Sequence, residues 1–408
     1  MEKLPKEDLL QHIWQYKYLL KQQLFTTTGL PIQILKPGTL NTAQGPDFFD
    51  ARIKIGDTLW AGNLEVHVCS SDWKKHKHSL DPAYDNIILH LVYIDDEIVL
   101  DKNGMPIPCL TLNNLLPNEV LLRYEKLFEA QSSIPCESLF EPIAPELQQL
   151  FFERLLIERL ERNCATIEKI WLKNEKNWEA CCYQLVFQYA GLGINKDPME
   201  QLFRKIPFSL FKKYQSEPNY LQALFLGLAG LIKPSETLLQ EIYTYLTHKH
   251  NLSPLPKGLW KYSGLRPHSF PAERILQIAT LFAKVENLLP LFLNLKHTQE
   301  ITAFGALKGV AFTHGLTINV IAPLQFSYAR LMGQIPNIEK LLALLEAMPA
   351  EDNKVIKLFQ NLGLNFITAK ESQAILELKK YYCNEKRCLQ CQFSAPIFKP
   401  NSWVSSFF

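Results

Sequence analysis

The sequence of 408 residues has no long uninterrupted hydrophobic stretch. Its longest apolar run, Tyr220–Ile232, falls short of the roughly 20 residues that a membrane-spanning helix needs. The N-terminus, MEKLPKEDLL, is charged and has no apolar run behind it, so it does not match a secretory signal peptide. We therefore expect a soluble, cytoplasmic protein that has no membrane among its partners.

The sequence also has a small net charge and no clear internal repeat, and it gives no reason to expect disulfides. A formal net charge of +2 excludes a protein that binds polyanions through bulk positive charge, but leaves room for a local basic groove. No internal repeat is evident, which argues against a solenoid. In the cytoplasm, the nine cysteines are expected to be thiols or metal ligands. The oligomeric state stays open.

Residues 1–131 combine helical and strand patterns, which predicts a mixed α/β domain. Leu64, Val66 and Val68 alternate with Glu65 and His67, so the two sets face opposite sides of a strand. The expected elements are an amphipathic helix at 6–24, a strand at 30–35, a hairpin at 51–60 with its turn at Gly56-Asp57, an interruption at Gly62-Asn63, strands at 64–68 and 86–93, a second hairpin around Asn103-Gly104 and a helix at 119–130.

The remainder of the chain has a different pattern. From 132 to 380 almost every apolar run has helical period, and Pro and Gly separate the runs, which predicts a large all-helical domain. Residues 381–408 form a Cys-rich C-terminal knuckle and tail. The predicted fold class is α+β. The helices are expected at 147–160, 166–171, 178–189, 221–231, 236–249, 272–289, 336–347 and 371–382.

The stretch Gly45–Tyr93 concentrates acidic and imidazole groups among the predicted strands. Such groups are costly to bury without partners, so they form either a paired network or a site. Asp47 opens one strand, and Glu65 and His67 share a face of another. The two carboxylates can converge on Mg²⁺ or Mn²⁺, which would activate a water and offset charge on a phosphate. His67 would orient or deprotonate that water.

This layout resembles the PD-(D/E)XK nuclease superfamily. Its pattern is Pro-Asp at the start of a strand, then Glu/Asp-x-Lys on the next strand, followed by a helix and another strand. Pro46-Asp47 and Glu65-Val66-His67 stand at the corresponding places. The resemblance implies a restriction-endonuclease-like domain, hydrolysis of nucleic-acid phosphodiesters, and an acid from the first helix, Glu7 or Asp8. His67 replaces the lysine, and its unperturbed pKa near roughly 6.5 means that it does not duplicate a permanent cation.

Several basic side chains are candidates for binding the substrate. Lys74, Lys75, His76 and His78 follow the Glu-x-His motif and would supply the missing cation or contact backbone phosphates, with DNA a better candidate than RNA. Arg266 and Arg274 lie in the loop Ser263–Arg274, which would bind phosphate or carboxylate or would be an arginine-anchored structural loop.

Three alternatives remain for the same cluster. In the first, His67, Asp72, His76 and His78 bind Zn²⁺ or Mn²⁺. In the second, the acids cap turns, Trp73 fills the core and His90 is a hydrogen-bonded core histidine. In the third, which the exchange of lysine for His67 favours, the domain is a non-catalytic nucleic-acid-binding or scaffold protein on a nuclease-like fold.

The C-terminal cysteines have the spacing of metal ligands. Cys383, Cys388 and Cys391 form a C-x4-C-x2-C pattern, which is typical of part of a zinc or iron–sulfur site. A fourth ligand would come from a histidine or from Cys136, Cys164, Cys181 or Cys182. The alternative is three reduced cysteines in a packed turn.

A second resemblance covers nearly the whole chain. The sequence resembles an uncharacterised bacterial family catalogued as domain of unknown function 2851. The resemblance implies a shared architecture and brings no established activity. It rests on Asn41, Gly45–Phe48, Gly62–His67, Ser71–Trp73, His76, His78, Tyr84, Asn86, Leu89-His90, Arg266-Pro267, Phe270-Pro271, Arg274, Tyr382-Cys383, Arg387–Leu389 and Cys391.

Overall fold

The structure is a computed structural model that describes residues 4–19, 23–296 and 310–399. The chain divides into two compact units. Unit 1 comprises Met1–Gln148 and Leu378–Phe408, and unit 2 comprises Gln149–Glu377. The C-terminal segment therefore belongs to the same unit as the N-terminal residues. Each unit is described by itself.

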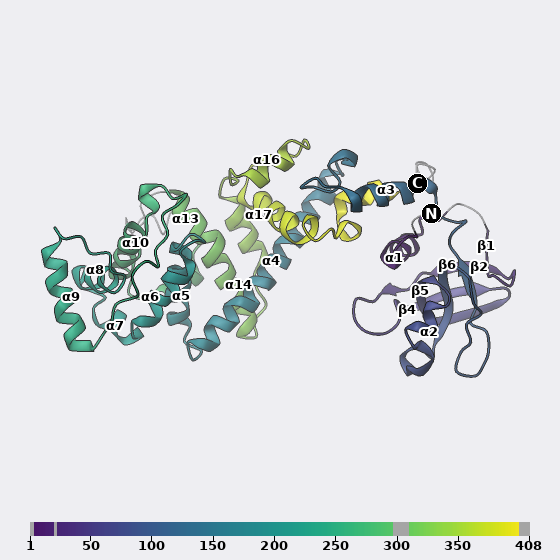
Figure 1. The fold of residues 1–408 in the computed structure, drawn as a ribbon, viewed down its shortest axis with the longest axis horizontal. Coiled ribbons are helices and arrows are strands. Elements are labelled where there is room, and N and C mark those ends of the chain that lie inside the picture. Colours follow the sequence, from purple (N-terminus) through teal and green to yellow (C-terminus); the bar gives the residue numbers. More distant parts are fainter. Residues whose placement is uncertain (1–3, 20–22, 297–309, 400–408) are drawn as a thin grey trace. The chain divides into compact units, whose positions relative to one another are not determined.

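Unit 1 is built on one mixed sheet with the order β1-β2-β4-β5-β6-β7, and β3 pairs with β4 (Figure 1). β4 is antiparallel to its neighbours β2 and β5, whereas β6 is parallel to β5 and β7 is parallel to β6. The strands are β1 (Leu24–Phe25), β2 (Pro31–Lys36), β3 (Thr39–Leu40), β4 (Phe48–Ile55), β5 (Thr58–Cys69), β6 (Ile87–Ile94) and β7 (Cys109–Thr111). The predicted combination of a mixed sheet with a helical region is confirmed.

The expected interruption at Gly62-Asn63 is wrong, because β5 runs through it without a break. Asn63 donates its N–H to the carbonyl of Asn86, which keeps the strand hydrogen-bonded where β6 begins beside it. Gly62 is needed for close approach: a Cβ there would lie 2.5 Å from Ile88 Cγ2 and 2.7 Å from the Asn86 carbonyl oxygen. Glycine in this strand therefore marks a tight backbone contact and not a turn.

Two further expectations about unit 1 are corrected. The first helix is shorter than predicted, since α1 ends at Gln15 and Lys17 has a left-handed φ of 55°. Residues 20–22 lie outside the described residues. The second hairpin is reduced to a single antiparallel bridge between Leu100 and Pro106, and β7 pairs instead with β6. In both cases contacts distant in the sequence override the local pattern.

The helices of unit 1 cover the sheet. Figure 1 draws α1 above β4 and β5, and α2 below them. α1 buries Leu9, Leu10, Ile13 and Trp14, and the Trp14 indole donates to the carbonyl of Pro37 at 2.9 Å. The helices are α1 (Glu7–Gln15), α2 (Asp72–Lys75), α3 (Asn118–Glu129) and α18 (Ala395–Phe398), with 3₁₀ turns η1 (His78–Leu80), η2 (Pro82–Tyr84), η3 (Glu137–Leu139), η7 (Cys388–Gln390) and η8 (Gln392–Ser394), and a π-helical turn η6 (Lys379–Cys383).

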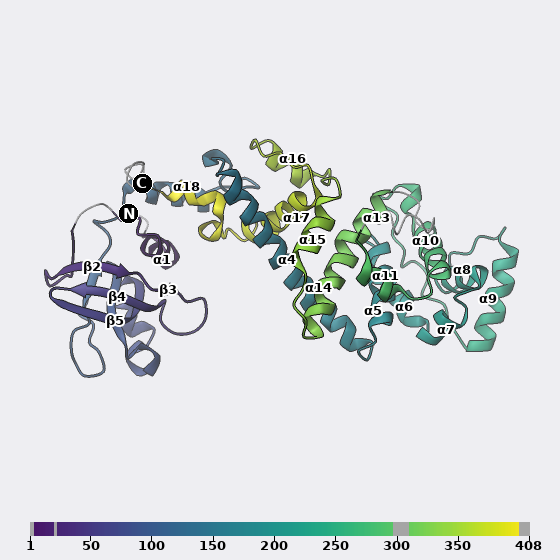
Figure 2. The ribbon, with the colours of Figure 1, turned by 180° about the vertical axis from the view of Figure 1, so that it is seen from behind.

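Unit 2 is helical throughout the part that the structure describes. Leu160 and Cys164 of α4 meet α14 and α15 in a small apolar cluster, and a larger aromatic core lies among α5, α8 and α10 (Figure 2). The helices are α4 (Pro145–Lys173), whose first residues belong to unit 1, α5 (Trp178–Ala190), α6 (Lys196–Lys205), α7 (Phe208–Lys213), α8 (Pro218–Leu228), α9 (Thr237–His250), α10 (Pro271–Lys284), α11 (Leu288–Asn294), α13 (Val310–Leu316), α14 (Ala322–Leu331), α15 (Ile338–Glu346), α16 (Lys354–Gln360) and α17 (Ala369–Leu378), with η4 (Pro267–Ser269) and a π-helical turn η5 (Thr317–Ile321).

The helix expected at 272–289 is instead two helices, α10 and α11, which bend by 91° at their junction. Conversely, the two helices expected at 147–160 and 166–171 are one, α4. Among the described helices none is by itself long and apolar enough to cross a membrane, although α10 and α11 pass that test as a bent pair.

Replacing Gly62 with alanine is expected to destabilise unit 1. The added Cβ would push the Asn86 carbonyl and the Ile88 side chain away from β5, and overpacking of this kind costs about 1–3 kcal/mol. Urea denaturation of Gly62→Ala tests this. Ala61→Ser, at the exposed neighbouring position, is the control and should unfold like the wild type. Equal stability of Gly62→Ala and the wild type would contradict the close contact.

His12 makes the stability of unit 1 depend on pH. Burial lowers its pKa to about 4, against a hydrogen bond to the backbone of Leu389 that raises it. Between about pH 6.5 and 4, His12 is protonated in the unfolded chain but neutral in the folded protein. The stability of the folded protein therefore falls as the pH drops through this range. Relative to His12→Gln, the wild type should lose up to about 3 kcal/mol over this range, as measured by urea denaturation at each pH. Parallel pH profiles for the two proteins would contradict this.

Candidate metal centre

Asp47 and Glu65 are tied together at the point where β4 enters the sheet. The Asp47 N–H donates to Glu65 Oε2 at 3.1 Å, and the Val66 N–H donates to Asp47 Oδ2 at 2.9 Å. The register places Phe48 opposite Leu64, so the residue before β4 lies beside Glu65. The two carboxylates therefore lie side by side, as the sequence predicts.

Strand alternation places His67 on the same face of β5 as Glu65. Both are buried, with 4% of Glu65 and 1% of His67 exposed. β-Bulges occur next to both acids, between Phe48 and Ala51 in β4 and between Asn63 and Leu64 in β5. Bulges re-aim side chains and are common next to functional sites.

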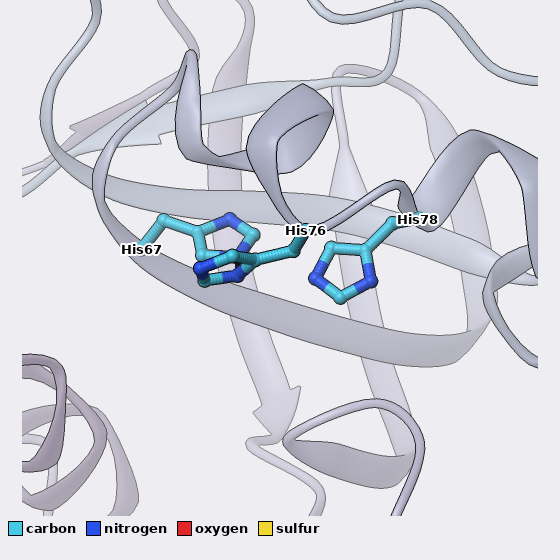
Figure 3. A group of neighbouring side chains, drawn as sticks. All are labelled: His67, His76 and His78. Carbon is cyan, nitrogen blue, oxygen red and sulfur yellow. Dashed lines mark hydrogen bonds between the residues drawn. The ribbon is translucent and has the colours of Figure 1, made fainter.

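Three imidazoles converge on this face (Figure 3). His67 comes from β5, whereas His76 and His78 come from the loop that follows α2. One ligand nitrogen of each ring lies within 4.8 Å of those of the other two. His67 Nε2 is 3.1 Å from His76 Nδ1, and Glu65 Oε1 is 3.2 Å from His78 Nε2 and 3.6 Å from His67 Nε2. Three imidazole nitrogens thus lie close together, and Glu65 Oε1 lies beside two of them.

This arrangement fits a transition-metal ion. Ligands about 2.0–2.1 Å from a tetrahedral ion lie about 3.3 Å from one another, close to the separations found here. The buried Nε2 of His78 has no hydrogen-bond partner, even though Glu65 Oε1 lies 3.2 Å away. A buried polar atom of this kind calls for an explanation, and a metal ligand is one. The imidazoles favour Zn²⁺ or Mn²⁺ over Mg²⁺.

His90 orients the central ring. It is fully buried on β6, and its Nε2 lies 2.8 Å from His67 Nδ1. A proton on His67 Nδ1 would leave Nε2 as the free ligand atom, and such a partner fixes the tautomer of a metal-bound histidine. His90 is a hydrogen-bonded core histidine, as one reading of the sequence expects, and its hydrogen-bond partner is His67 of the cluster. Trp73 contacts the edges of the His67, His78 and His90 rings.

Helix α1 contributes an acid to the centre. Glu7 interacts electrostatically with His76 and Glu65, and it hydrogen-bonds to the backbone of Val68. One helical turn later, Gln11 donates to Asp47 Oδ1 at 2.9 Å. Asp8 faces elsewhere, because its carboxylate accepts from the Tyr124 hydroxyl at 3.0 Å. Of the two acids expected from the first helix, the structure therefore brings Glu7 to the cluster.

Burial and like charge dominate the electrostatics of the centre. Burial, and next the charge of Glu65, raise the pKa of Asp47 to about 7. Burial, followed by the neighbouring imidazoles, holds the pKa of His67 far below its ordinary value. His67 is consequently neutral at pH 7, which suits a metal ligand and not a substitute for a lysine cation.

The other predicted residues of this region lie at the edge of the cluster. Asp72 accepts from the Cys69 N–H at 3.0 Å and pairs with Lys75 at 2.6 Å. Its carboxylate therefore already has partners next to and within α2. Lys74 is exposed and pairs with Glu97. Lys74 and Lys75 therefore lie next to the histidines, but each already has an acidic partner.

Arg266 and Arg274 lie in unit 2. Arg266 is exposed at the start of η4. Arg274 is buried, donates to Gln277 Oε1 at 2.8 Å and to Ser269 Oγ at 3.0 Å, and lies over the ring of Phe312. These contacts are those of an arginine that anchors a loop. A role in binding substrate stays a prediction for both.

No role in the site is predicted from the sequence for Gln11 or Tyr84. Gln11 lies four residues after Glu7, the spacing that puts two side chains on one helix face, and this was the available signal. Tyr84 stacks on the His78 ring at 3.9 Å between centroids. Nothing in the local sequence indicates that stacking, since the two residues meet through the fold of the η1–η2 loop.

Comparison with known proteins identifies the family. The family model described as "Protein of unknown function (DUF2851)" matches residues 7–308, which include every residue of the candidate metal centre. The chain belongs to this family, as the sequence motifs predict. No curated protein and no solved structure matches it.

The centre is expected to bind Zn²⁺ or Mn²⁺ through His76. This side chain is exposed, so His76→Ala should fold normally and bind the ion at least about tenfold more weakly in isothermal titration calorimetry. The control is His248→Ala, which removes an exposed imidazole from α9 in unit 2. Identical affinities for both variants and the wild type would exclude His76 as a ligand.

Proposed function

We propose that unit 1 is a divalent-metal-dependent hydrolase of nucleic-acid phosphodiesters. The observation that supports this best is the position of the Glu65 carboxylate. Its Oε2 accepts from Asp47 and its Oε1 lies beside His67 and His78, so Glu65 joins an acidic group to an imidazole group. Carboxylate and imidazole ligands at one buried point are typical of metal-assisted hydrolysis.

The order of the elements supports a restriction-endonuclease-like domain. Helix α1 is followed by the antiparallel strands β2, β4 and β5, then by α2, and then by β6 parallel to β5. The PD-(D/E)XK pattern places its acids at the start of one strand and within the next, followed by a helix and a strand. Asp47 and Glu65 occupy those places, and Glu7 is the acid from the first helix.

Each side chain then has a distinct task. Glu65, His67, His76 and His78 would hold the ion, and Asp47 would hold Glu65 in position or join it as a ligand. A bound divalent ion lowers the pKa of a coordinated water and offsets charge that develops on phosphate. His90 fixes the tautomer of His67. Burial raises the pKa of Glu7 above its ordinary value, which is the direction that favours a carboxylate acting as a proton acceptor.

The proposed substrate is DNA. Lys74 and Lys75 are exposed on α2, directly before His76, where they would contact backbone phosphates after exchanging their acidic partners. Such contacts neutralise phosphate charge and make binding dependent on salt.

Cleavage assays of the full chain test the proposal. Labelled single- and double-stranded DNA and RNA are incubated with Mn²⁺, Zn²⁺ or Mg²⁺. Cleavage is expected with Mn²⁺ or Zn²⁺, and Glu65→Gln should reduce it by at least about 100-fold. Asp50→Asn is the matched control and should keep full activity, because Asp50 is exposed and pairs with Lys36. Wild type no more active than an Asp47→Ala/Glu65→Ala double variant would rule out the nuclease.

The second candidate is a non-catalytic nucleic-acid-binding or scaffold protein. It is favoured by the exchange of lysine for His67, whose two ring nitrogens both lie within hydrogen-bonding distance of other histidines. In the same assay this protein would retain labelled DNA without cleaving it, with no difference between wild type and Glu65→Gln.

A further inference from the structure

Four cysteines lie in two segments that are distant in the sequence and in contact within unit 1. Cys136 lies directly before η3, Cys383 ends η6, Cys388 begins η7 and Cys391 follows it. Cys383, Cys388 and Cys391 each interact electrostatically with Cys136. The structure thus selects Cys136 from the four cysteines that the sequence offers as a partner of the C-terminal motif.

Side-chain contacts hold the C-terminal segment against the region that carries Cys136. The Lys386 ammonium donates to the carbonyl of Phe128 at 2.6 Å, at the end of α3. The rings of Phe140 and Phe393 lie 5.5 Å apart between centroids. These two contacts lie on either side of Cys136 in the sequence. The two segments are therefore held together by more than one side chain.

The C-terminal motif is folded into a compact turn that brings Cys383, Cys388 and Cys391 into one short segment. The Arg387 N–H donates to the carbonyl of Tyr382 at 2.8 Å, which reverses the chain between Cys383 and Cys388, and Lys386 has a left-handed φ of 53° in that reversal. The Ser394 hydroxyl donates to the carbonyl of Cys391 at 2.8 Å and also to that of Cys388. The turn is therefore held by its own hydrogen bonds.

The secondary-structure elements of this segment are short. η7 and η8 have 3 residues each and α18 has 4. Isolated turns of this length are not stable in water, so their order depends on tertiary contacts or a cross-link. All nine cysteines are free, so no disulfide supplies that link.

We propose that Cys136, Cys383, Cys388 and Cys391 hold a metal centre through four thiolates, and that this centre fastens the C-terminal segment to the segment after α3 that carries Cys136. The occupant is a zinc ion or an iron–sulfur cluster, both of which take four cysteines. In the described part of the chain, only the histidine cluster has three ligand atoms within 4.8 Å of one another. The four sulfurs must therefore close in around a single ion, or hold a larger cluster at wider spacing.

Cys136 and Cys388 are buried, and Cys383 and Cys391 are half-buried. Without a cation the group is neutral and makes only weak hydrogen bonds. A bound metal replaces the four thiol protons and stabilises the thiolates, and its binding energy adds to the folding energy.

Metal analysis of the full chain tests the proposal. The protein is purified anaerobically, and its zinc, iron and acid-labile sulfide are measured together with the visible absorption spectrum. The expected result is about one zinc per chain in addition to any zinc at the histidine centre, or iron with matching sulfide and a visible band. X-ray absorption at the metal edge should show four sulfur neighbours, which separates this centre from zinc at the histidines.

Two variants make the test specific. Cys136→Ala should lose the sulfur-bound metal by at least tenfold, whereas Cys164→Ala should keep it. The two cysteines are equally buried, at 8% exposed each, and Cys164 lies in α4 of unit 2. The proposal is overturned if both variants keep the metal, or if the wild type takes up no sulfur-bound metal even after reconstitution with zinc or with iron and sulfide. Should Cys136→Ala fail to fold, a sulfur count of three instead of four in the wild type overturns it.

Discussion

The reciprocal tie between Asp47 and Glu65 is the constraint on which the rest of unit 1 depends. One backbone N–H is donated to each carboxylate, from Asp47 to Glu65 and from Val66 to Asp47. These bonds join the start of β4 to the middle of β5 and satisfy part of the hydrogen-bonding capacity of each carboxylate. They do so with neutral backbone donors and not with the ammonium or guanidinium of a side chain. The negative charge of the pair is therefore still available to a cation, which is the requirement of a metal centre.

The loop after β5 brings the imidazoles back over that pair. The Asp72 carboxylate at the start of the short helix α2 accepts from the Cys69 N–H, and Trp73 packs edge-on against the rings of His67 and His78. Tyr84 closes the other side of His78 by stacking. The histidines are thus held by aromatic packing, and their nitrogens remain directed at Glu65 and at one another. Rigid support of this kind is what a binding site needs from the residues around its ligands.

Helix α1 connects the two candidate metal centres of unit 1. One side presents Glu7 and Gln11 to the carboxylates, while His12 hydrogen-bonds to the backbone of Leu389, the residue that follows Cys388. The C-terminal turn therefore packs behind the helix that supplies the acid. Any ion that orders the cysteines would also restrain α1, and through it the position of Glu7. This gives a physical reason for the chain to return to unit 1 after the helices of unit 2.

The sequence by itself determined the features that depend on local geometry. Strand alternation puts Glu65 and His67 on one face, and Pro46-Asp47 begins the strand beside them, because side-chain parity follows from the backbone alone. The tertiary structure decided everything that depends on docking. Glu7 and Asp8 are neighbours on a helix, and only the packing of α1 determines which acid faces the sheet. The hydrogen bond between His67 and His90 and the ion pair between Lys74 and Glu97 likewise join residues far apart in the chain. The continuity of β5 through Gly62 has the same origin, since a glycine that reads locally as a break is needed there for the close approach of Asn86.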